Sequence, residues 1–321
     1  MDDPRGDTAM NPSSGDRDLD VAVLLPCYNE AAAIAATIEG FRKHLPRARI
    51  FVYDNNSSDG TADIARAHGA IVRKETRQGK GHVVQRMFAD VEADIYVLAD
   101  GDGTYDAASA PEIIRQLREG PYDVINAGRL EQSRAAYRPG HRFGNWMLTT
   151  LVRVSFNASW TDMLSGYKVM SRRFVKSFPI SSAGFEIETE LFIHAIEAGA
   201  ASTEIMCSYF ERGAGSTSKL NTFRDGFRIL RMIGVLIKDE RPMQFFSAAA
   251  AIMVGAALII AWPVFQEYAR TGLVPRFPTA VLATGLVLAG MLSQTAGFVL
   301  DGIARTRRET KRLFFLRYPA I

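Results

Sequence analysis

The chain has 321 residues, of which 47% are hydrophobic and 23% are charged, and its formal net charge is +3. This length allows about two domains and the apolar content allows a packed core, whereas so small a net charge gives no indication of nucleic-acid binding. The two cysteines, Cys27 and Cys207, have no metal-like spacing and build no disulfide framework, so we expect a reducing compartment. Residues 1–19 are polar and lack the apolar core of a signal peptide, which predicts a disordered arm.

Short apolar runs alternate with helix-like segments after this arm. The expected strands cover residues 20–26, 48–54, 70–74, 94–99 and 122–128. Asn29 is expected to cap the first helix. Strands that alternate with helices predict an α/β fold with a mostly parallel sheet covered by helices on both faces. Such sheets bind ligands at the carboxyl ends of their strands, which is where Asp54 and Asp100 are placed.

The pattern is less regular after residue 130. We expect helices around residues 140–157 and 184–199, followed by a strand near 203–210. Residues 221–240 place apolar side chains on one helical face and basic side chains elsewhere. This pattern predicts an amphipathic helix lying along a membrane surface.

Two long apolar segments lie near the end of the chain, at residues 243–262 and 279–300. Each has about 20 residues without a charge, which is enough to cross a bilayer core of about 30 Å. The alternative is a buried helical hairpin in a soluble domain. Basic residues flank the outer ends of the two segments, so the positive-inside rule predicts that both chain termini are cytoplasmic.

These features divide the chain into five expected regions. They are the arm (1–19), a cytoplasmic α/β domain (20–220), an amphipathic juxtamembrane helix (221–242), a transmembrane hairpin (243–301) and a basic cytoplasmic tail (302–321).

The expected fourth strand ends in a cluster of carboxylates, in the sequence DGDGTYD at residues 100–106. The Gly-rich signatures of a dinucleotide site and of a P-loop are both missing, the first after residue 26 and the second around Lys80. Asp100 and Asp102 carry like charges two residues apart, an arrangement that a divalent cation relieves. Mg²⁺ and Mn²⁺ prefer such oxygen ligands together with substrate phosphates. The alternative is an ordinary solvated turn, since Asp and Gly are common turn residues.

Five short motifs occur in one order along the first half of the chain. They are PCYNE (26–30), YDNNSSDGT (53–61), GKG (79–81), DGDGTYD (100–106) and AGR (127–129). Together they resemble a family-2 glycosyltransferase of the GT-A fold over residues 20–220. DMLSGYKVMSRR (162–173), RGAGSTSKL (212–220) and the two apolar segments narrow the resemblance to the polyprenyl-phosphate glycosyltransferases, which include the dolichyl-phosphate mannose synthases.

The resemblance implies roles for the matching residues on the nucleotide-sugar side. Pro26, Tyr28 and Glu30 would line the base and ribose pocket, Asp54 would bind the nucleoside, Lys80 would lie near the nucleotide, and Asp100 and Asp102 would hold the metal and the diphosphate. Arg212 and Lys219 are candidates to close over the same phosphates. Asn55 and Asn56 stand where the commoner form of this motif reads Asp-Asp-Gly. The motif therefore leaves the identity of the nucleotide base undecided. Asp106 is expected first as a helix cap and second as a sugar ligand.

An anionic acceptor calls for basic residues of its own. Arg129 is the first candidate to bind an acceptor phosphate, and Arg138, His141 and Arg142 follow. Asp162, which the resemblance places in a family motif, could touch the sugar, act as a base or brace the site. Asp102, Asp162 and Arg129 are therefore the candidate catalytic residues. Of Glu186 and Glu188, two apart on a helix, at most one is expected to face the site.

The resemblance implies inverting transfer of a hexose-type sugar from a nucleotide diphosphate sugar to a polyprenyl phosphate at the cytoplasmic face of an inner membrane. A UDP-sugar is favoured, with GDP-mannose as the main rival, and Mg²⁺ or Mn²⁺ as the cofactor. A lipid-linked sugar for cell-envelope glycan assembly would be the product. The alternatives are a glycosyltransferase acting on a sugar or glycolipid hydroxyl, and a non-catalytic membrane scaffold that binds nucleotide sugar. No nucleic-acid partner is expected. The sequence leaves open whether the chain forms a homo-oligomer.

Overall fold

The structure is a computed structural model that describes residues 19–131, 160–179, 187–210, 234–235, 238–239 and 241–321. Several sequence predictions lie outside these residues. They are the arm to residue 18, the helix at 140–157, most of the helix at 221–240, and the side chains of Arg138, His141, Arg142, Glu186, Arg212 and Lys219.

Strands and helices alternate through the first part of the described chain. The strands are β1 (Val21–Cys27), β2 (Arg49–Asp54), β3 (Ile71–Lys74), β4 (Ile95–Leu98), β5 (Val124–Glu131), β6 (Lys168–Ser171) and β7 (Ser202–Tyr209). The helices of this domain are α1 (Ile34–His44), α2 (Thr61–Ala67), α3 (Lys80–Asp90), α4 (Ala110–Glu119), α6 (Arg172–Ser177) and α7 (Ile187–Glu197), with a 3₁₀ turn η2 (Ala107–Ser109).

The strands form one sheet in the order β3-β2-β1-β4-β6-β5-β7. β1 pairs in parallel with β2 and β4, and β5 pairs in parallel with β7. β6 lies antiparallel between β4 and β5. The mostly parallel sheet is therefore confirmed, while β6 (Lys168–Ser171) was not predicted, because Lys168 and Ser171 interrupt the kind of apolar run that marks β4.

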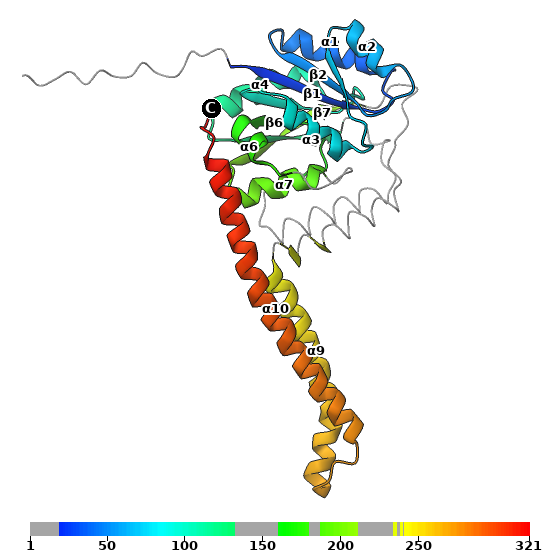
Figure 1. Cartoon of the computed structure of the whole chain (residues 1–321), viewed down its shortest axis with the longest axis vertical. Helices are drawn as coiled ribbons and strands as arrows, with labels where there is room; N and C mark the ends of the chain where they lie inside the picture. Colours follow the sequence, from blue (N-terminus) through cyan, green and yellow to red (C-terminus); the bar gives the residue numbers. More distant parts are fainter. Residues whose placement is uncertain (1–18, 132–159, 180–186, 211–233, 236–237, 240) are drawn as a thin grey trace, which may run out of the picture.

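Helices cover both faces of this sheet (Figure 1). Alternate residues of each strand point to opposite faces, so Leu24 and Tyr96 belong to one buried cluster and Val23 and Val97 to the other. The first cluster is completed by side chains of α3, α6 and α7, and the second by side chains of α1, α2 and α4. This two-sided cover buries the strands and leaves their carboxyl ends for a site.

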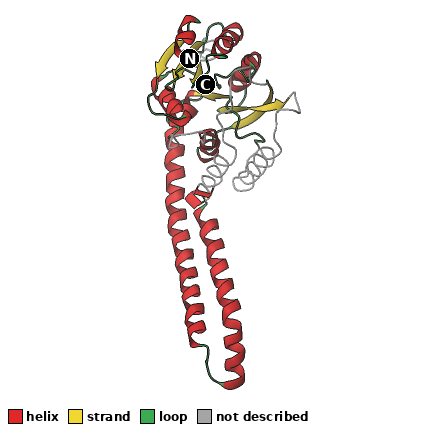
Figure 2. Ribbon diagram, turned by 90° about the vertical axis from the view of Figure 1, so that its right-hand side faces the viewer, coloured by secondary structure: helices red, strands yellow, loops and turns green. Residues whose placement is uncertain are grey.

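Two long helices follow, α9 (Pro242–Thr271) and α10 (Phe277–Leu316), and project from the domain as an antiparallel hairpin (Figures 1 and 2). Both are long and apolar enough to cross a membrane by length and composition, and only 17% of the most apolar stretch of each is buried. Such exposure is unlike the core helix of a soluble protein.

Small residues make the contact between these two helices. The buried positions recur every seven residues, at Ala250, Ala257 and Val264 in α9 and at Ala283, Gly290, Gly297 and Ala304 in α10. A seven-residue repeat keeps one seam of each helix facing its partner. A side-chain carbon on Gly297 would lie 3.0 Å from Phe246, so glycine is what allows the close approach.

The second long helix extends beyond its apolar part. The sequence assigned residues 302–321 to a basic tail, but α10 continues to Leu316 and packs against the α/β domain. Phe315 is buried in the same cluster as α6 and α7, and Lys311 pairs with Glu197 of α7 at 2.5 Å. The hairpin and the domain are therefore one packed body at this point.

Candidate active site

The site is built at the carboxyl edge of the sheet. β1 ends at Cys27 and β2 at Asp54, which are paired in register, and Leu98 at the end of β4 lies beside Leu24 of β1. The residues that follow these strands therefore come together, as expected for a sheet of this kind. They include Asp100 and Asp102, which follow β4 directly.

Glycines let the carboxylate segment lie close to its neighbours. A side-chain carbon on Gly101 would lie 2.4 Å from Sγ of Cys27, and one on Gly166 would lie 2.4 Å from Oδ2 of Asp100. Both distances are far below contact, so any larger residue would displace the strand end or the loop that carries Gly166. The segment DGDG is thus a tightly seated structure rather than a loose solvated turn.

Lys80 lies at the centre of the charged residues. Its Nζ is 2.5 Å from Oδ1 of Asp100 and 2.5 Å from Oε1 of Glu188, and the Lys80 and Glu188 side chains are almost fully buried. Burial alone would lower the pKa of Lys80, but the two carboxylates raise it above its ordinary value. Lys80 is therefore a fixed ammonium group. Glu188, the described member of the Glu186–Glu188 pair, faces the site.

Two asparagines fix the loop that presents Lys80. Nδ2 of Asn55 donates to the carbonyls of Glu75 and Arg77, and its Oδ1 accepts from the amide of Gly79 at 2.7 Å. Asn56 donates to the carbonyl of Thr76 at 2.9 Å. The departure from Asp-Asp-Gly therefore has a structural consequence, because these amides shape the approach to α3.

The residues expected at the base and ribose lie along the same edge. Pro26 is buried at the end of β1, Tyr28 is exposed, and Asp54 is buried and accepts from the amide of Ser57 at 3.3 Å. The amide of Glu30 donates to Oγ1 of Thr61 at 2.9 Å. These contacts join the loop after β1 to the loop after β2 and form one wall of the edge.

Asp102 is held in a different way from Asp100. Its buried carboxylate accepts from the amide and the hydroxyl of Thr104, at 3.2 and 2.6 Å. Asp106 caps η2 by accepting from the amide of Ala108 at 2.9 Å, which confirms the cap predicted for it. The turn after β4 thereby directs Asp102 inward.

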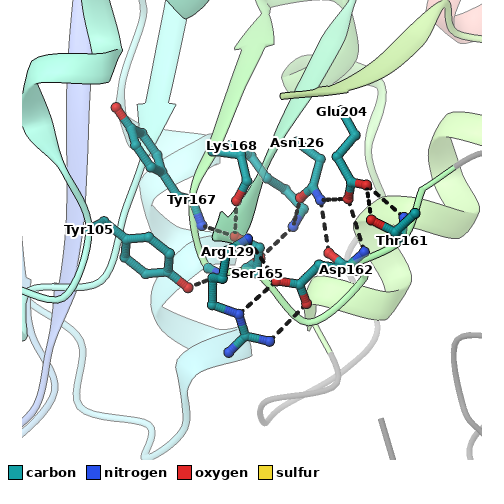
Figure 3. Close-up of polar contacts among 11 residues, drawn as sticks. Tyr105, Asn126, Arg129, Thr161, Asp162, Ser165, Tyr167, Lys168 and Glu204 are labelled. Atoms are coloured by element: carbon teal, nitrogen blue, oxygen red, sulfur yellow. Dashed lines mark hydrogen bonds and ion pairs between the residues drawn. The ribbon is translucent and has the colours of Figure 1, made fainter. Parts of the chain in front are cut away.

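Arg129 and Asp162 form a two-pronged ion pair (Figure 3). Nε and Nη2 of Arg129 donate to the two carboxylate oxygens of Asp162 at 2.7 and 2.8 Å, and the Arg129 amide donates at 3.1 Å. Burial alone would raise the pKa of Asp162, but Arg129 outweighs it and holds that pKa below its ordinary value. The carboxylate stays ionised and orients the guanidinium, which favours the bracing role among the three considered for Asp162.

A polar network holds the segment that carries Asp162 (Figure 3). Glu204 of β7 accepts from the amides of Thr161 and Asp162 at 2.7 and 3.0 Å. Nδ2 of Asn126 donates to Glu204 and to the carbonyl of Asp162, both at 2.8 Å. Gly166 donates to the hydroxyl of Tyr105 at 2.7 Å. These contacts link the Arg129–Asp162 pair to the loop that touches Asp100.

Lys168 is a second buried lysine in this region. Its Nζ donates to Oδ1 of Asn126 at 2.9 Å and to the carbonyl of Ser165 at 2.6 Å. Burial lowers the pKa of Lys168 to about 8, although Glu188 and Asp162 act against this shift. The sequence analysis assigned no role to Lys168, Asn126 or Glu204. A lysine inside the apolar run YKVM was the one signal that could have indicated a buried polar contact.

The carboxylates fit a hard divalent cation that shares its ligands with a substrate. Among the described residues no group of three or more His, Cys, Asp or Glu side chains could enclose a metal ion. One or two carboxylates completed by substrate phosphates is the ligand set that Mg²⁺ uses in nucleotide sites. Asp100 and Asp102 offer that set at the strand edge, so a metal would be held together with a diphosphate rather than by the protein alone.

Comparisons with known proteins agree with the fold. Mannosyl-3-phosphoglycerate synthase from Rubrobacter xylanophilus superposes with a TM-score of 0.59 at 22% identity, over 70% of this chain and 76% of that one. Glucosyl-3-phosphoglycerate synthase from Mycobacterium tuberculosis, solved with Mn²⁺, UDP and glucosyl-3-phosphoglycerate, gives 0.56 at 22% identity over 69% and 80%. The fold is that of the GT-A glycosyltransferases.

Sequence relatives specify the family. Glycosyltransferase AglJ from Haloferax volcanii is 32% identical over 90% of this chain and 95% of its own length. A dolichyl-phosphate hexose transferase from the same organism is 27% identical over 69% and 96%. The family profile described as glycosyl transferase family 2 matches residues 22–178. The chain belongs to this family of glycosyltransferases.

Proposed function

We propose that this protein transfers a hexose-type sugar from a nucleotide diphosphate sugar to a polyprenyl phosphate at the cytoplasmic face of a membrane. The observation that carries the proposal is one sheet edge that joins the Asp100–Asp102 segment to the Arg129–Asp162 pair, in a chain with two span-length helices. The relative named a dolichyl-phosphate hexose transferase supports the class of acceptor. A UDP-sugar is the favoured donor, and GDP-mannose is its rival.

The proposed arrangement in the membrane follows from the helices. α9 and α10 would cross the bilayer, and the domain at residues 20–220 and both termini would be cytoplasmic. The α/β domain packs directly on the end of α10, which holds the site at a set distance from the lipid surface. The product would be a lipid-linked sugar for envelope glycan assembly.

The reaction exchanges one phosphate oxygen for another at the anomeric carbon. An oxygen of the acceptor phosphate bonds to that carbon from the side opposite the nucleotide, while the bond from the carbon to the diphosphate oxygen breaks. Configuration inverts and the nucleoside diphosphate leaves. The acceptor oxygen is already ionised, so no proton has to be removed from it.

The positive groups of the site offset the negative charges of the leaving diphosphate and the acceptor phosphate. A Mg²⁺ or Mn²⁺ ion held by Asp100 and Asp102 would supply Lewis-acid stabilisation of the leaving diphosphate. Lys80 adds a fixed positive charge beside Asp100. Arg129, oriented by Asp162, is the described residue best suited to bind the acceptor phosphate through its fork of donors.

The state of Asp162 favours a phosphate acceptor over a hydroxyl acceptor. A sugar hydroxyl needs a general base with a pKa near the working pH. The lowered pKa and the two-pronged pairing of Asp162 make it a poor base. A phosphate acceptor has no such requirement.

A substrate screen tests the proposal. Full-length protein in detergent is incubated with UDP- and GDP-sugars, Mg²⁺ or Mn²⁺, and polyprenyl phosphate or a neutral glycolipid, and released nucleoside diphosphate is measured. We expect release only with polyprenyl phosphate and a divalent cation. Release with the neutral glycolipid would support the hydroxyl-acceptor alternative, and no release with any pair would support the scaffold.

A further inference from the structure

A groove separates the end of α6 from the upper part of α10. It encloses about 930 Å³, and one wall is formed by Lys176 to Pro179 while the other is formed by α10 between Val299 and Phe314. This volume lies within the range of ligand sites in proteins. The groove lies between the domain and the hairpin, where α10 leaves its apolar segment.

The position of the groove along α10 connects it to the bilayer. The uncharged segment of α10 ends at Leu300, and the groove begins at Val299. From Val299 to Phe314 the helix rises about 22 Å, at 1.5 Å per residue. Val299 and Ile303 extend the apolar surface of the span into the groove, so a lipid chain can enter it from the cytoplasmic leaflet.

Apolar side chains are exposed inside this groove, above the level of the span. Ile303 is 60% exposed and Phe314 is 53% exposed. Phe178 forms the inner wall, where its ring packs against His194 with centroids 4.9 Å apart. Apolar surface of this kind outside the hydrocarbon region indicates a binding site.

Among the lining residues that the structure describes, the charged ones are Lys176, Arg307 and Lys311, and all three are basic. Lys311 holds Glu197 at 2.5 Å, and Arg307 donates to the carbonyl of Asp239 at 3.0 Å. An ammonium has three donors, so Lys311 can hold Glu197 and a phosphate together.

We propose that the groove binds an anionic phospholipid of the cytoplasmic leaflet. One acyl chain lies against Phe178, Ile303 and Phe314, and the phosphate lies beside Arg307 and Lys311. The apolar floor requires a chain and the basic rim requires an anion, and the bilayer next to Val299 supplies both in one molecule. This site depends on the membrane location of the hairpin and not on the sugar donor.

Gly302 offers a way to fill the groove without disturbing the packing. A side-chain carbon on Gly302 meets nothing within 4 Å, and the same holds for Gly285 in the span. Gly302→Phe therefore blocks the groove, while Gly285→Phe places the same ring on α10 away from it. Thr306→Phe, one turn further along, is a second blocking variant if the first does not fold.

The experiment measures lipid retention by native mass spectrometry. Full-length protein in mild detergent receives equal amounts of phosphatidylglycerol and phosphatidylcholine, without nucleotide sugar. We expect one phosphatidylglycerol to be retained about fivefold over phosphatidylcholine, and Arg307→Gln to remove about that factor. Gly302→Phe should abolish retention, and Gly285→Phe should preserve it.

Four results would overturn the proposal. Equal retention of the two lipids, or unchanged retention in both blocking variants, would show that no such site exists. Displacement of phosphatidylglycerol by added polyprenyl phosphate would assign the groove to the acceptor. A photo-crosslinker at Thr306 that reacts with residues 211–233 rather than with lipid would assign it to the chain itself. None of these results bears on whether sugar transfer occurs.

Discussion

Asp100 and Asp102 have the same charge, yet their surroundings differ. Asp100 is partly exposed and pairs with Lys80, whereas Asp102 is buried and accepts from Thr104. A bound divalent cation is the relief that the sequence predicts for this pair, with a solvated turn as the alternative. Lys80 already offsets one of the charges, so the metal role of the pair stays a prediction that needs its own test.

Replacing Asp102 by Asn removes the charge and keeps the shape of the side chain. We expect turnover to fall by about 100-fold or more, because the leaving diphosphate loses electrostatic stabilisation. Released nucleoside diphosphate and Mn²⁺ binding by calorimetry measure the effect. Asp106→Asn is the matched control and should stay close to wild type, because Asn caps a helix as well as Asp does. Unchanged Mn²⁺ affinity in Asp102→Asn would contradict the metal role.

Glu188 supplies a buried counter-charge to Lys80 and opposes the burial that lowers the pKa of Lys168. Glu188→Gln is expected to lower the free energy of unfolding by about 3 kcal/mol, because a buried ion pair loses one partner. Thermal unfolding in detergent measures this change. Glu112→Gln, at an exposed ion pair with Arg115, is the control and should leave the midpoint unchanged.

Asp162 acts on Arg129 if the bracing role is correct. Asp162→Asn should raise the KM for polyprenyl phosphate about tenfold, because the guanidinium loses a charged partner worth about 1.5–3 kcal/mol. The KM for the nucleotide sugar and the acidic limb of the pH–rate profile should change little. Loss of that acidic limb together with a collapse of kcat would indicate that Asp162 is a general base instead.

At the scale of elements, most residues of the sequence motifs lie in the loops that follow the strands. Asn29 was expected to cap the first helix, but this prediction is wrong. α1 begins at Ile34 after Ala33, and Asn29 has a positive φ of 52° with its Oδ1 accepting from the amide of Ser58. A side chain that caps a helix and one that joins two loops look alike in sequence, because both belong to short polar turns.

The packing of α7 on α6 gives a stability that depends on pH. His194 is buried, its Nε2 lies 3.1 Å from Oγ of Ser177, and Phe174 and Phe178 flank its ring. Burial and, to a smaller extent, the nearby Lys311 lower the pKa of His194 to about 4, while Glu197 acts in the opposite direction.

Since the folded pKa lies below the unfolded value of about 6.5, the unfolded chain binds the proton more tightly. The contribution of His194 is complete above pH 6.5 and is lost as the pH falls towards 4, by about 3 kcal/mol in all. Denaturant unfolding between pH 4 and 8 measures this slope. His194→Gln should flatten it, and an equal slope in the variant would mean that other groups cause it.

At the scale of the whole molecule, the hairpin is more than an anchor. Phe315 at the end of α10 is buried in the cluster of α6 and α7, and the guanidinium of Arg173 lies 4.8 Å from the centroid of its ring. A chain truncated before α9 would therefore expose part of the domain core.

Phe315→Ala tests this coupling. We expect the free energy of unfolding to fall by about 3 kcal/mol, as for other buried aromatic side chains. Phe314→Ala, at the exposed neighbouring position, should cost much less. Thermal unfolding of the full chain in detergent compares the two. Similar midpoints for both variants would show that α10 does not stabilise the domain.

The sequence alone determined the features that arise from local patterns. The α/β sheet was predicted from apolar runs of strand length, and the two long helices from uncharged segments of span length. The family was predicted from the ordered motifs at residues 26–30, 53–61 and 100–106. These features follow from contacts between near neighbours in the chain, or from burial of whole segments, so their signal is contained in a short stretch.

The tertiary structure alone decided which distant residues meet. Lys80 and Glu188 are 108 positions apart, and Asn126 and Glu204 are 78 apart. Neither pair has a pattern in sequence, because a single polar residue on a helix or a strand looks like a solvated surface residue. Insertion of β6 between β4 and β5, and the docking of Phe315, likewise depend on how whole elements pack. A charged side chain can be buried only where an oppositely charged partner lies beside it. Only the folded chain brings such partners together.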